Sequence, residues 1–159
     1  GNYYLTGDTA EIHADGSMSF VGRSDDVITT SGYRIGPFDV ESALLEHDAV
    51  VEAAVVGVPD PERTEVVKAF IILAQGVEAT DQLSTELSEF VKKRLSAHAY
   101  PRLVEFVTEL PKTPSGKIQR FLLRNQEINK QELKKQDINK QEVNQKEINQ
   151  KEMSKQQAV

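Results

Sequence analysis

Residues 50–58 read VVEAAVVGV, and residues 66–74 read VVKAFIILA. Both runs are short, nearly continuous in apolar residues and rich in valine and isoleucine, a pattern typical of buried β-strands. The segment Pro59-Asp60-Pro61 ends the first run, because proline has no N–H to donate to a sheet. The two runs therefore predict a pair of buried strands at the centre of the domain.

Helices and a third strand are predicted around this pair. Residues 37–46 read as a helix, with Pro37 in its first turn and three apolar residues on one side, Val40, Leu44 and Leu45. Residues 81–98 give the clearest helical spacing, and Thr80 or Asp81 can cap that helix. Its periodic positions are Leu83, Leu87, Phe90, Val91, Arg94 and Leu95. Residues 103–107 predict a third strand, and a terminal helix is expected from Phe121.

The N-terminal part predicts shorter β-structure. Residues 11–14 and 18–21 flank Asp15-Gly16-Ser17 and read as a hairpin. Residues 25–30 are a further strand candidate, followed by the turn Ser31-Gly32. The fold class that we predict is α+β, with a small sheet of about three strands packed by helices and preceded by the hairpin.

The last 37 residues form a polar repeat of five residues. Since five helical residues turn the chain by about 140° net, apolar side chains at this spacing wind around a helix and form no stripe. We expect a frayed helix or a disordered tail, with a partner-binding segment as the alternative. The apolar positions are Leu123, Ile128, Leu133, Ile138, Val143, Ile148 and Met153.

Size and charge exclude several functional classes. The 159 residues suit one domain with appendages, contain no cysteine and contain no apolar run near the roughly 18 residues of a membrane span. Residues 1–122 hold 11 basic and 19 acidic residues, a net charge of −8, whereas residues 123–159 hold 8 and 6, a net of +2. The acidic part argues against nucleic-acid binding. The lack of cysteine fits the cytoplasm, and the start at Gly1 suggests a piece of a longer chain.

Three polar clusters carry the candidate chemistry. They read Tyr4-Leu5-Thr6-Gly7-Asp8, then Gly22-Arg23-Ser24-Asp25-Asp26-Val27-Ile28 continuing to Ser31-Gly32-Tyr33-Arg34-Ile35-Gly36-Pro37, and finally Pro111-Lys112-Thr113-Pro114-Ser115-Gly116-Lys117-Ile118. Each cluster alone is more commonly an ordinary surface turn. A lysine behind a Pro-Ser-Gly turn also suits transient binding of a phosphate or carboxylate. The three histidines, His13, His47 and His98, lack the spacing of metal ligands, and we assign no metal site.

In this order and spacing, the clusters resemble the C-terminal motifs of the adenylate-forming enzymes, in particular acetyl- and medium-chain acyl-CoA synthetases. The resemblance covers residues 1–123 and excludes the tail. Asp39 stands where this family usually has Glu, Thr64 where many members have Gly, and Ala99 where many medium-chain members have Lys. The last departure weakens the expectation of a basic contact to CoA from that position.

The resemblance implies three segments. Residues 1–24 would be the end of a large N-terminal domain, residues 25–122 the mobile C-terminal domain, and residues 123–159 an appended tail. Full-length members convert a carboxylic acid, ATP with Mg, and CoA into acyl-CoA, AMP and pyrophosphate through an acyl-adenylate. The partner of this domain would be its own large domain, and the fragment alone is expected to be inactive. The alternative is a stand-alone, non-catalytic binding or regulatory module with the same fold.

The resemblance also implies roles for individual residues. Lys117 would be the catalytic lysine of adenylation, Asp8 and Arg23 would bind the nucleotide, and Asp25 would be the hinge. The loop for CoA and thioester formation would consist of Ser31, Gly32, Tyr33 and Arg34.

Overall fold

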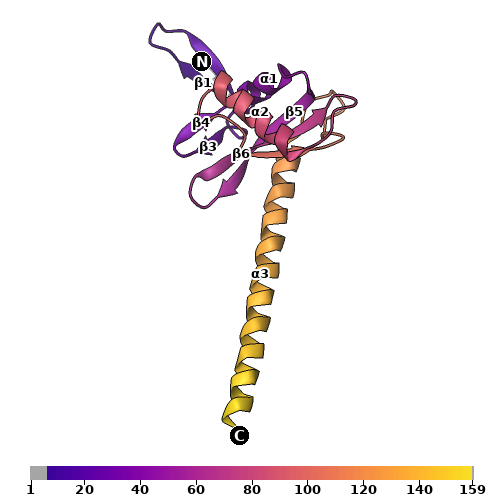
Figure 1. Cartoon of the computed structure of the whole chain (residues 1–159). Coiled ribbons are helices and arrows are strands. Elements are labelled where there is room, and N and C mark those ends of the chain that lie inside the picture. The colour runs from indigo at the N-terminus through magenta and orange to yellow at the C-terminus, as the bar shows by residue number, and fades with distance from the viewer. Residues whose placement is uncertain (1–6, 159) are drawn as a thin grey trace. The chain divides into compact units, whose positions relative to one another are not determined.

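The computed structural model describes residues 7–158, and the chain divides into two compact units, residues 1–124 and residues 125–159. The first unit contains the sheet and its helices (Figure 1). Most of the first polar cluster, residues 4–6, lies outside the described residues, whereas Asp8 lies within them.

The two apolar runs form the central strands, as predicted. β5 (Val50–Asp60) and β6 (Thr64–Leu73) pair antiparallel along their whole length. β7 (Leu103–Phe106) lies parallel to β6, and β3 (Ile28–Thr30) joins β6 through the pair Thr30 and Thr64. β4 (Tyr33–Ile35) completes a sheet of five strands by pairing with β3. The α+β class is confirmed, and the sheet exceeds the expected three strands because two strands of three residues each extend it.

Both faces of the central strands are buried, which explains why their sequences are apolar without alternation. Side chains of β5 and β6 point alternately to opposite faces. One face, which includes Val55 and Ile71, packs against α1 (Pro37–Leu45) and α2 (Asp81–Arg94). The other face, which includes Val56 and Phe70, packs against residues from the C-terminal part of this unit, namely Val107, Leu110, Ile118 and Leu123.

The helices follow the predicted spacing, with two corrections. In α1, Val40 and Leu44 are fully buried, but Leu45, predicted on the same side, is half exposed. In α2, Thr80 is the N-cap and accepts a hydrogen bond from the Leu83 N–H, whereas the helix ends at Arg94 and does not reach His98. It ends there because Leu95 leaves the helical conformation, with φ −105° and ψ −82°.

The predicted hairpin is present and slightly longer than expected. β1 (Asp8–Ile12) pairs antiparallel with β2 (Met18–Arg23), and Gly16 takes a positive φ of 83° in the connecting turn. The pairing sets Asp8 directly opposite Arg23. Two residues that are far apart in the sequence are thereby neighbours at the end of the hairpin.

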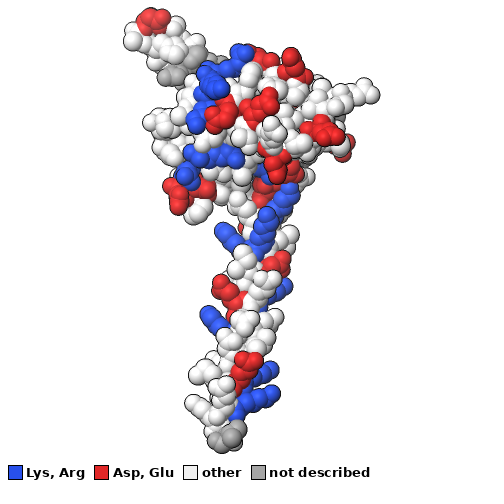
Figure 2. All heavy atoms as spheres, viewed as in Figure 1, with Lys and Arg blue, Asp and Glu red and all other residues white. Residues whose placement is uncertain are grey.

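The tail is helical. α3 (Arg120–Gln157) contains the repeat, and no heptad stripe forms. On the face that Figure 2 shows, basic and acidic side chains of α3 are interspersed. No helix within residues 7–158 combines the length and apolar character needed to cross a bilayer. The exposed apolar residues of the repeat in the second unit are Leu133, Ile138, Val143, Ile148 and Met153.

Candidate functional site

The Lys117 loop is a small, internally bonded hairpin. Thr113 donates its N–H to the Lys117 carbonyl at 2.8 Å, and the Lys117 N–H donates to Thr113 Oγ1 at 3.1 Å. A β-bridge between Lys112 and Ile118 closes the hairpin. Gly116, with φ 85°, makes the turn that a residue with a side chain would adopt only under strain. The backbone at Lys117 is therefore held in place although the loop lies at the surface.

The two lysines of this loop have different surroundings. Lys112 Nζ lies 2.6 Å from Glu52 Oε1 and is tied to β5. The side chain of Lys117, by contrast, makes no ion pair with any residue between 7 and 158, and it is exposed. A cation without a counter-charge on a fixed backbone is suited to binding an external anion. The two lysines thus offer a comparison of a structural and a candidate functional cation.

A second group lies at the junction of the hairpin and the sheet domain. Arg23 Nε lies 3.3 Å from Asp25 Oδ1, and both side chains are exposed. The pKa of the Asp25 carboxyl lies below its ordinary value, first because its own backbone N–H donates to it and second because Arg23 does. Asp25 is thus a carboxylate that pairs with Arg23 at the exposed junction.

A pocket of about 640 Å³ joins these two groups. It brings Lys117 to the same cavity as Arg23 and Asp25, although a long stretch of sequence separates them. Such a cavity can hold a nucleotide-sized anion between two cations. Its lining consists of Arg23, Asp25, Asp26, Thr113, Gly116, Lys117, Ile118, Gln119, Arg120 and Phe121.

The loop of residues 31–34 does not line this pocket. Gly32, with φ 83°, has open space where a side chain would stand. The Ser31 N–H donates to the Arg63 carbonyl at 2.9 Å, and the Tyr33 ring stacks on His98 with centroids 3.8 Å apart. Arg34 is exposed. The structure therefore gathers Lys117, Arg23 and Asp25 at the pocket and places residues 31–34 at a separate turn. Asp8 lies opposite Arg23 in the hairpin and does not line the pocket.

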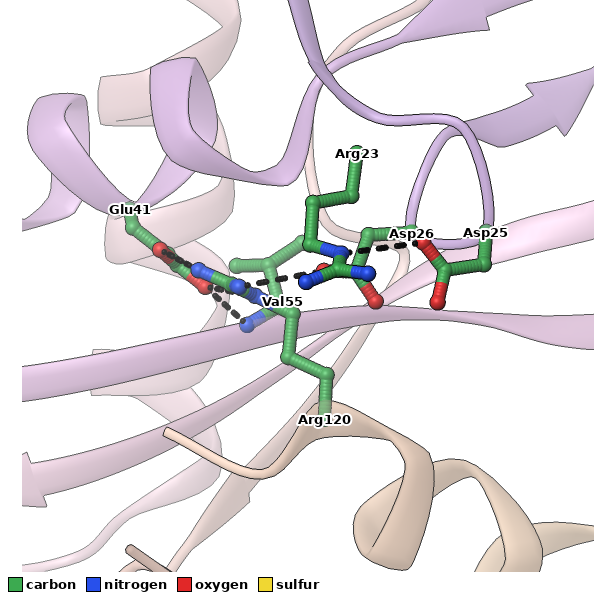
Figure 3. A network of polar contacts seen from close by, with 6 residues as sticks. All are labelled: Arg23, Asp25, Asp26, Glu41, Val55 and Arg120. Carbon is green, nitrogen blue, oxygen red and sulfur yellow. Dashed lines mark hydrogen bonds and ion pairs between the residues drawn. The ribbon is translucent and has the colours of Figure 1, made fainter. Parts of the chain in front are cut away.

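Three polar residues near the pocket received no role from the sequence. Arg120 lies between the carboxylates of Asp26 and Glu41, and the side chains of all three are partly or fully buried (Figure 3). The acidic partners precede Arg120 by 94 and 79 positions. A single sequence carries no signal for pairing over such distances. The one available hint is that Asp26 follows Asp25, the predicted hinge residue.

Metal ligation is not indicated by the described part of the chain. Within residues 7–158, no three His, Asp or Glu side chains gather in a way that could hold a metal ion. His47 lies 3.1 Å from Glu86, and His98 is engaged with Tyr33.

Comparison with known proteins identifies a family for this domain. Residues 39–117 match the family described as AMP-binding enzyme C-terminal domain. The chain carries this domain and belongs to that family.

Individual relatives are acyl-CoA synthetases. Over 128 residues, the chain is 59% identical to the mitochondrial acyl-coenzyme A synthetase ACSM4 of Rattus norvegicus, a match that covers 79% of this chain and 22% of that protein. It is 54% identical over 129 residues to the acetyl-coenzyme A synthetase of Bacillus subtilis, covering 81% and 23%. The crystal structure of an acyl-CoA synthetase from Brucella canis superposes with a TM-score of 0.67 and 73% identity, covering 82% and 24%. The chain thus spans about a quarter of the length of such relatives.

Proposed function

We propose that this chain is the C-terminal part of an AMP-forming acyl-CoA synthetase, which joins a carboxylic acid to CoA with ATP through an acyl-adenylate. The observation that carries the proposal is the pocket that Lys117 shares with Arg23 and Asp25. The family membership and the named relatives support the same activity. In this proposal, residues 1–24 end the large domain, residues 25–122 are the mobile domain, and residues 123–159 are an appended tail.

Lys117 would act in adenylation. Its ammonium, which pairs with no residue between 7 and 158, would contact the acyl carboxylate and the α-phosphate, where negative charge is redistributed during the transfer. A cation positioned there contributes on the order of 10²- to 10³-fold to the rate. Asp8 would accept hydrogen bonds from the ribose hydroxyls, and Arg23, opposite it in the hairpin, would hold the nucleotide from the neighbouring strand.

Thioester formation would use the other loop. Rotation of the domain about Asp25 would carry Lys117 away and turn residues 31–34 towards the adenylate. The open space beside Gly32 would let the thiol arm of CoA pass close to the backbone. Arg34 would add a cation near the CoA phosphates, and Ser31 and Tyr33 would shape the turn. Mg would accompany ATP, and no step assigned to this chain requires a metal contact.

The adenylation assignment is tested in the full-length protein that contains this chain. Acid-dependent exchange of pyrophosphate into ATP is measured with carboxylic acids from acetate to octanoate. Lys117→Ala should lower this exchange by about 100-fold or more, while thioester formation from supplied acyl-adenylate stays within about threefold. Lys112→Ala is the matched control, because its ion pair with Glu52 is exposed and the backbone bridge from Lys112 to Ile118 remains. It should leave both steps near the wild-type rates. Equal loss of both steps in Lys117→Ala would refute the assignment.

The thioester assignment has its own matched pair. Gly32→Leu should slow thioester formation by blocking the path of the thiol, and should spare adenylation. Gly76→Leu places the same side chain on a glycine with the same φ of 83° and equally open space, and should spare both steps. A wild-type protein that exchanges no pyrophosphate with any acid would favour the non-catalytic module. The cytoplasm is the proposed location, on the basis of the cysteine-free composition.

A further inference from the structure

Arg120 makes three polar contacts with two acidic residues. It begins α3, shortly after Lys117, and its side chain is about one-fifth exposed. Its Nε donates to Glu41 Oε1 at 2.9 Å, and one terminal nitrogen donates to Glu41 Oε2 at 2.7 Å. The other terminal nitrogen reaches Asp26 Oδ2 at 3.4 Å. The guanidinium therefore bridges α1 and the residue that follows the proposed hinge (Figure 3).

Glu41 is the buried acidic partner of Arg120. Its side chain is buried, and Oε1 also accepts the Val55 N–H at 2.9 Å, so the carboxylate is anchored to β5 as well as to α1. Burial acts to lower the pKa of Arg120, but the hydrogen bonds and charge of Glu41, together with Asp26, outweigh it and raise that pKa. The guanidinium thus remains charged, in a geometry that a two-pronged donor satisfies and a single ammonium does not.

Asp26 is the second acidic partner of Arg120. Asp25 and Asp26 are consecutive, yet they pair with different arginines, Asp25 with Arg23 and Asp26 with Arg120. Arg23 belongs to the hairpin that precedes the proposed hinge, whereas Arg120 belongs to the body that follows it. In the proposed function, this change of partner between two adjacent residues would set the start of the moving body at Asp26 and leave Asp25 as the pivot.

Hydrogen bonds of the backbone connect Arg120 to the Lys117 loop. The Gln119 N–H donates to the Pro111 carbonyl at 2.9 Å, which joins the two sides of the hairpin just before Arg120. Thr113 is bonded to Lys117 in both directions, through its N–H and its hydroxyl. A displacement of Arg120 is therefore transmitted to the base of the Lys117 loop.

We infer, on the basis of the proposed function, that Arg120 is a positioning residue, which ties the Lys117 loop and Asp26 to Glu41 so that Lys117 keeps a fixed place relative to the hinge. When the domain rotates about Asp25, the lysine then arrives at one position in the adenylation site. Loss of the Arg120 contacts would leave the fold intact, but Lys117 would then occupy a range of positions. A displacement of about 1 Å can lower a rate by about 100-fold.

A purely structural ion pair is the competing explanation, and the chain contains a matched example. Arg124, one helical turn after Arg120, lies 2.6 Å from the buried Glu65, which also accepts the Thr29 N–H at 2.8 Å. This pair has the same composition and a similarly buried glutamate, although Arg124 is 40% exposed and Arg120 21%. Its bonds reach neither the Lys117 loop nor residues 25–26. Arg124→Lys therefore controls for the general cost of replacing a partly buried arginine by lysine.

The first experiment measures both half-reactions in the full-length protein. Arg120→Lys keeps the charge but cannot reach both carboxylates at once, so pyrophosphate exchange should fall by about tenfold or more. Thioester formation from supplied acyl-adenylate should stay within about threefold, because Lys117 is not used there. Asp26→Asn should give the same pattern to a smaller extent, with a lower rate of pyrophosphate exchange and little change in thioester formation. Arg124→Lys should preserve the ratio of the rate of pyrophosphate exchange to the rate of thioester formation. Equal losses of both steps in Arg120→Lys would overturn the inference.

The second experiment does not depend on activity and uses the present chain. Amide hydrogen exchange in Arg120→Lys should become about tenfold faster at Thr113 and Gly116 in the loop and at Asp26, because their bonds open more often once the tie is weakened. In Arg124→Lys the faster amide should instead be Thr29, which bonds to Glu65. Unchanged exchange at Thr113 and Asp26 in Arg120→Lys would refute the inference. A wild-type protein without pyrophosphate exchange would refute the proposed function and leave this second result to decide on Arg120.

Discussion

Gly57 and Glu65 lie opposed so closely that the glycine has no room for a side chain. A Cβ at Gly57 would stand 2.8 Å from the Cδ and Oε1 of Glu65. The Glu65 carboxylate cannot move away easily, because it accepts the Thr29 N–H and pairs with Arg124. This contact explains a glycine in the middle of a buried strand, where it otherwise weakens the sheet.

Gly57→Ala should lower the free energy of unfolding by about 1–3 kcal/mol, the usual range for overpacking. Chemical denaturation of the variant measures this loss. In the Glu65→Ala background the same substitution should be neutral or stabilising, since the clash is gone and alanine suits a strand better than glycine. Equal effects of Gly57→Ala in both backgrounds would contradict the proposed clash.

Thr64 has a positive φ of 71°, which is strained for a β-branched residue. Relief of about 1–2 kcal/mol exceeds the roughly 0.5–1 kcal/mol entropic cost of glycine. Thr64→Gly should therefore raise the melting temperature, and Thr64→Asn should do so too, since asparagine tolerates this conformation. Thr108→Gly, at an exposed position without a positive φ, should lower it slightly. Calorimetry on the three variants decides, and a lower melting temperature for both Thr64 variants would argue against strain.

The lowered pKa of Asp25 predicts a pH dependence with a defined sign. Because the folded-state pKa lies below that of the unfolded chain, Asp25 favours folding above the ordinary aspartate range, near pH ~4. This contribution is lost as the pH falls through the folded-state pKa. In an NMR titration of the carboxyl carbon, Arg23→Gln should raise the midpoint only partly, because the backbone N–H of Asp25 is the larger cause. A midpoint that does not change would exclude a contribution from Arg23.

The sequence predicted those features that depend on local pattern. The apolar runs at 50–58 and 66–74, the cap at Thr80 and the turn at Gly16 are readable because each depends on neighbouring residues. Helix ends were less predictable, since Leu95 continues the apolar spacing of α2 yet lies after its last helical residue and is partly exposed. Periodicity reports which residues could share a face and not where the backbone turns away.

The candidate site was predictable as residues but not as an arrangement. Lys117, Arg23 and Asp25 were named from motifs, and the structure gathers them in one pocket. The bridge of Arg120 to Asp26 and Glu41 was not predicted, because it depends on contacts between segments that only the folded sheet brings together. The separation of Gly32 from that pocket was likewise not predicted, because Gly32 lies in the turn between β3 and the edge strand β4.

The five-residue repeat of the tail offers a comparison between two of its leucines. Leu123 is 4% exposed and packs on one face of the sheet with Val56 and Phe70, whereas Leu133 is 61% exposed. Leu123→Ala should lower the free energy of unfolding of the first unit by about 2–5 kcal/mol, and Leu133→Ala should change it by less than about 0.5 kcal/mol. Chemical denaturation monitored at a residue of the sheet, such as the Val55 amide, measures the change in unfolding free energy for each variant. A loss at Leu133 as large as that at Leu123 would mean that the repeat contributes to the stability of the folded domain beyond its first residue.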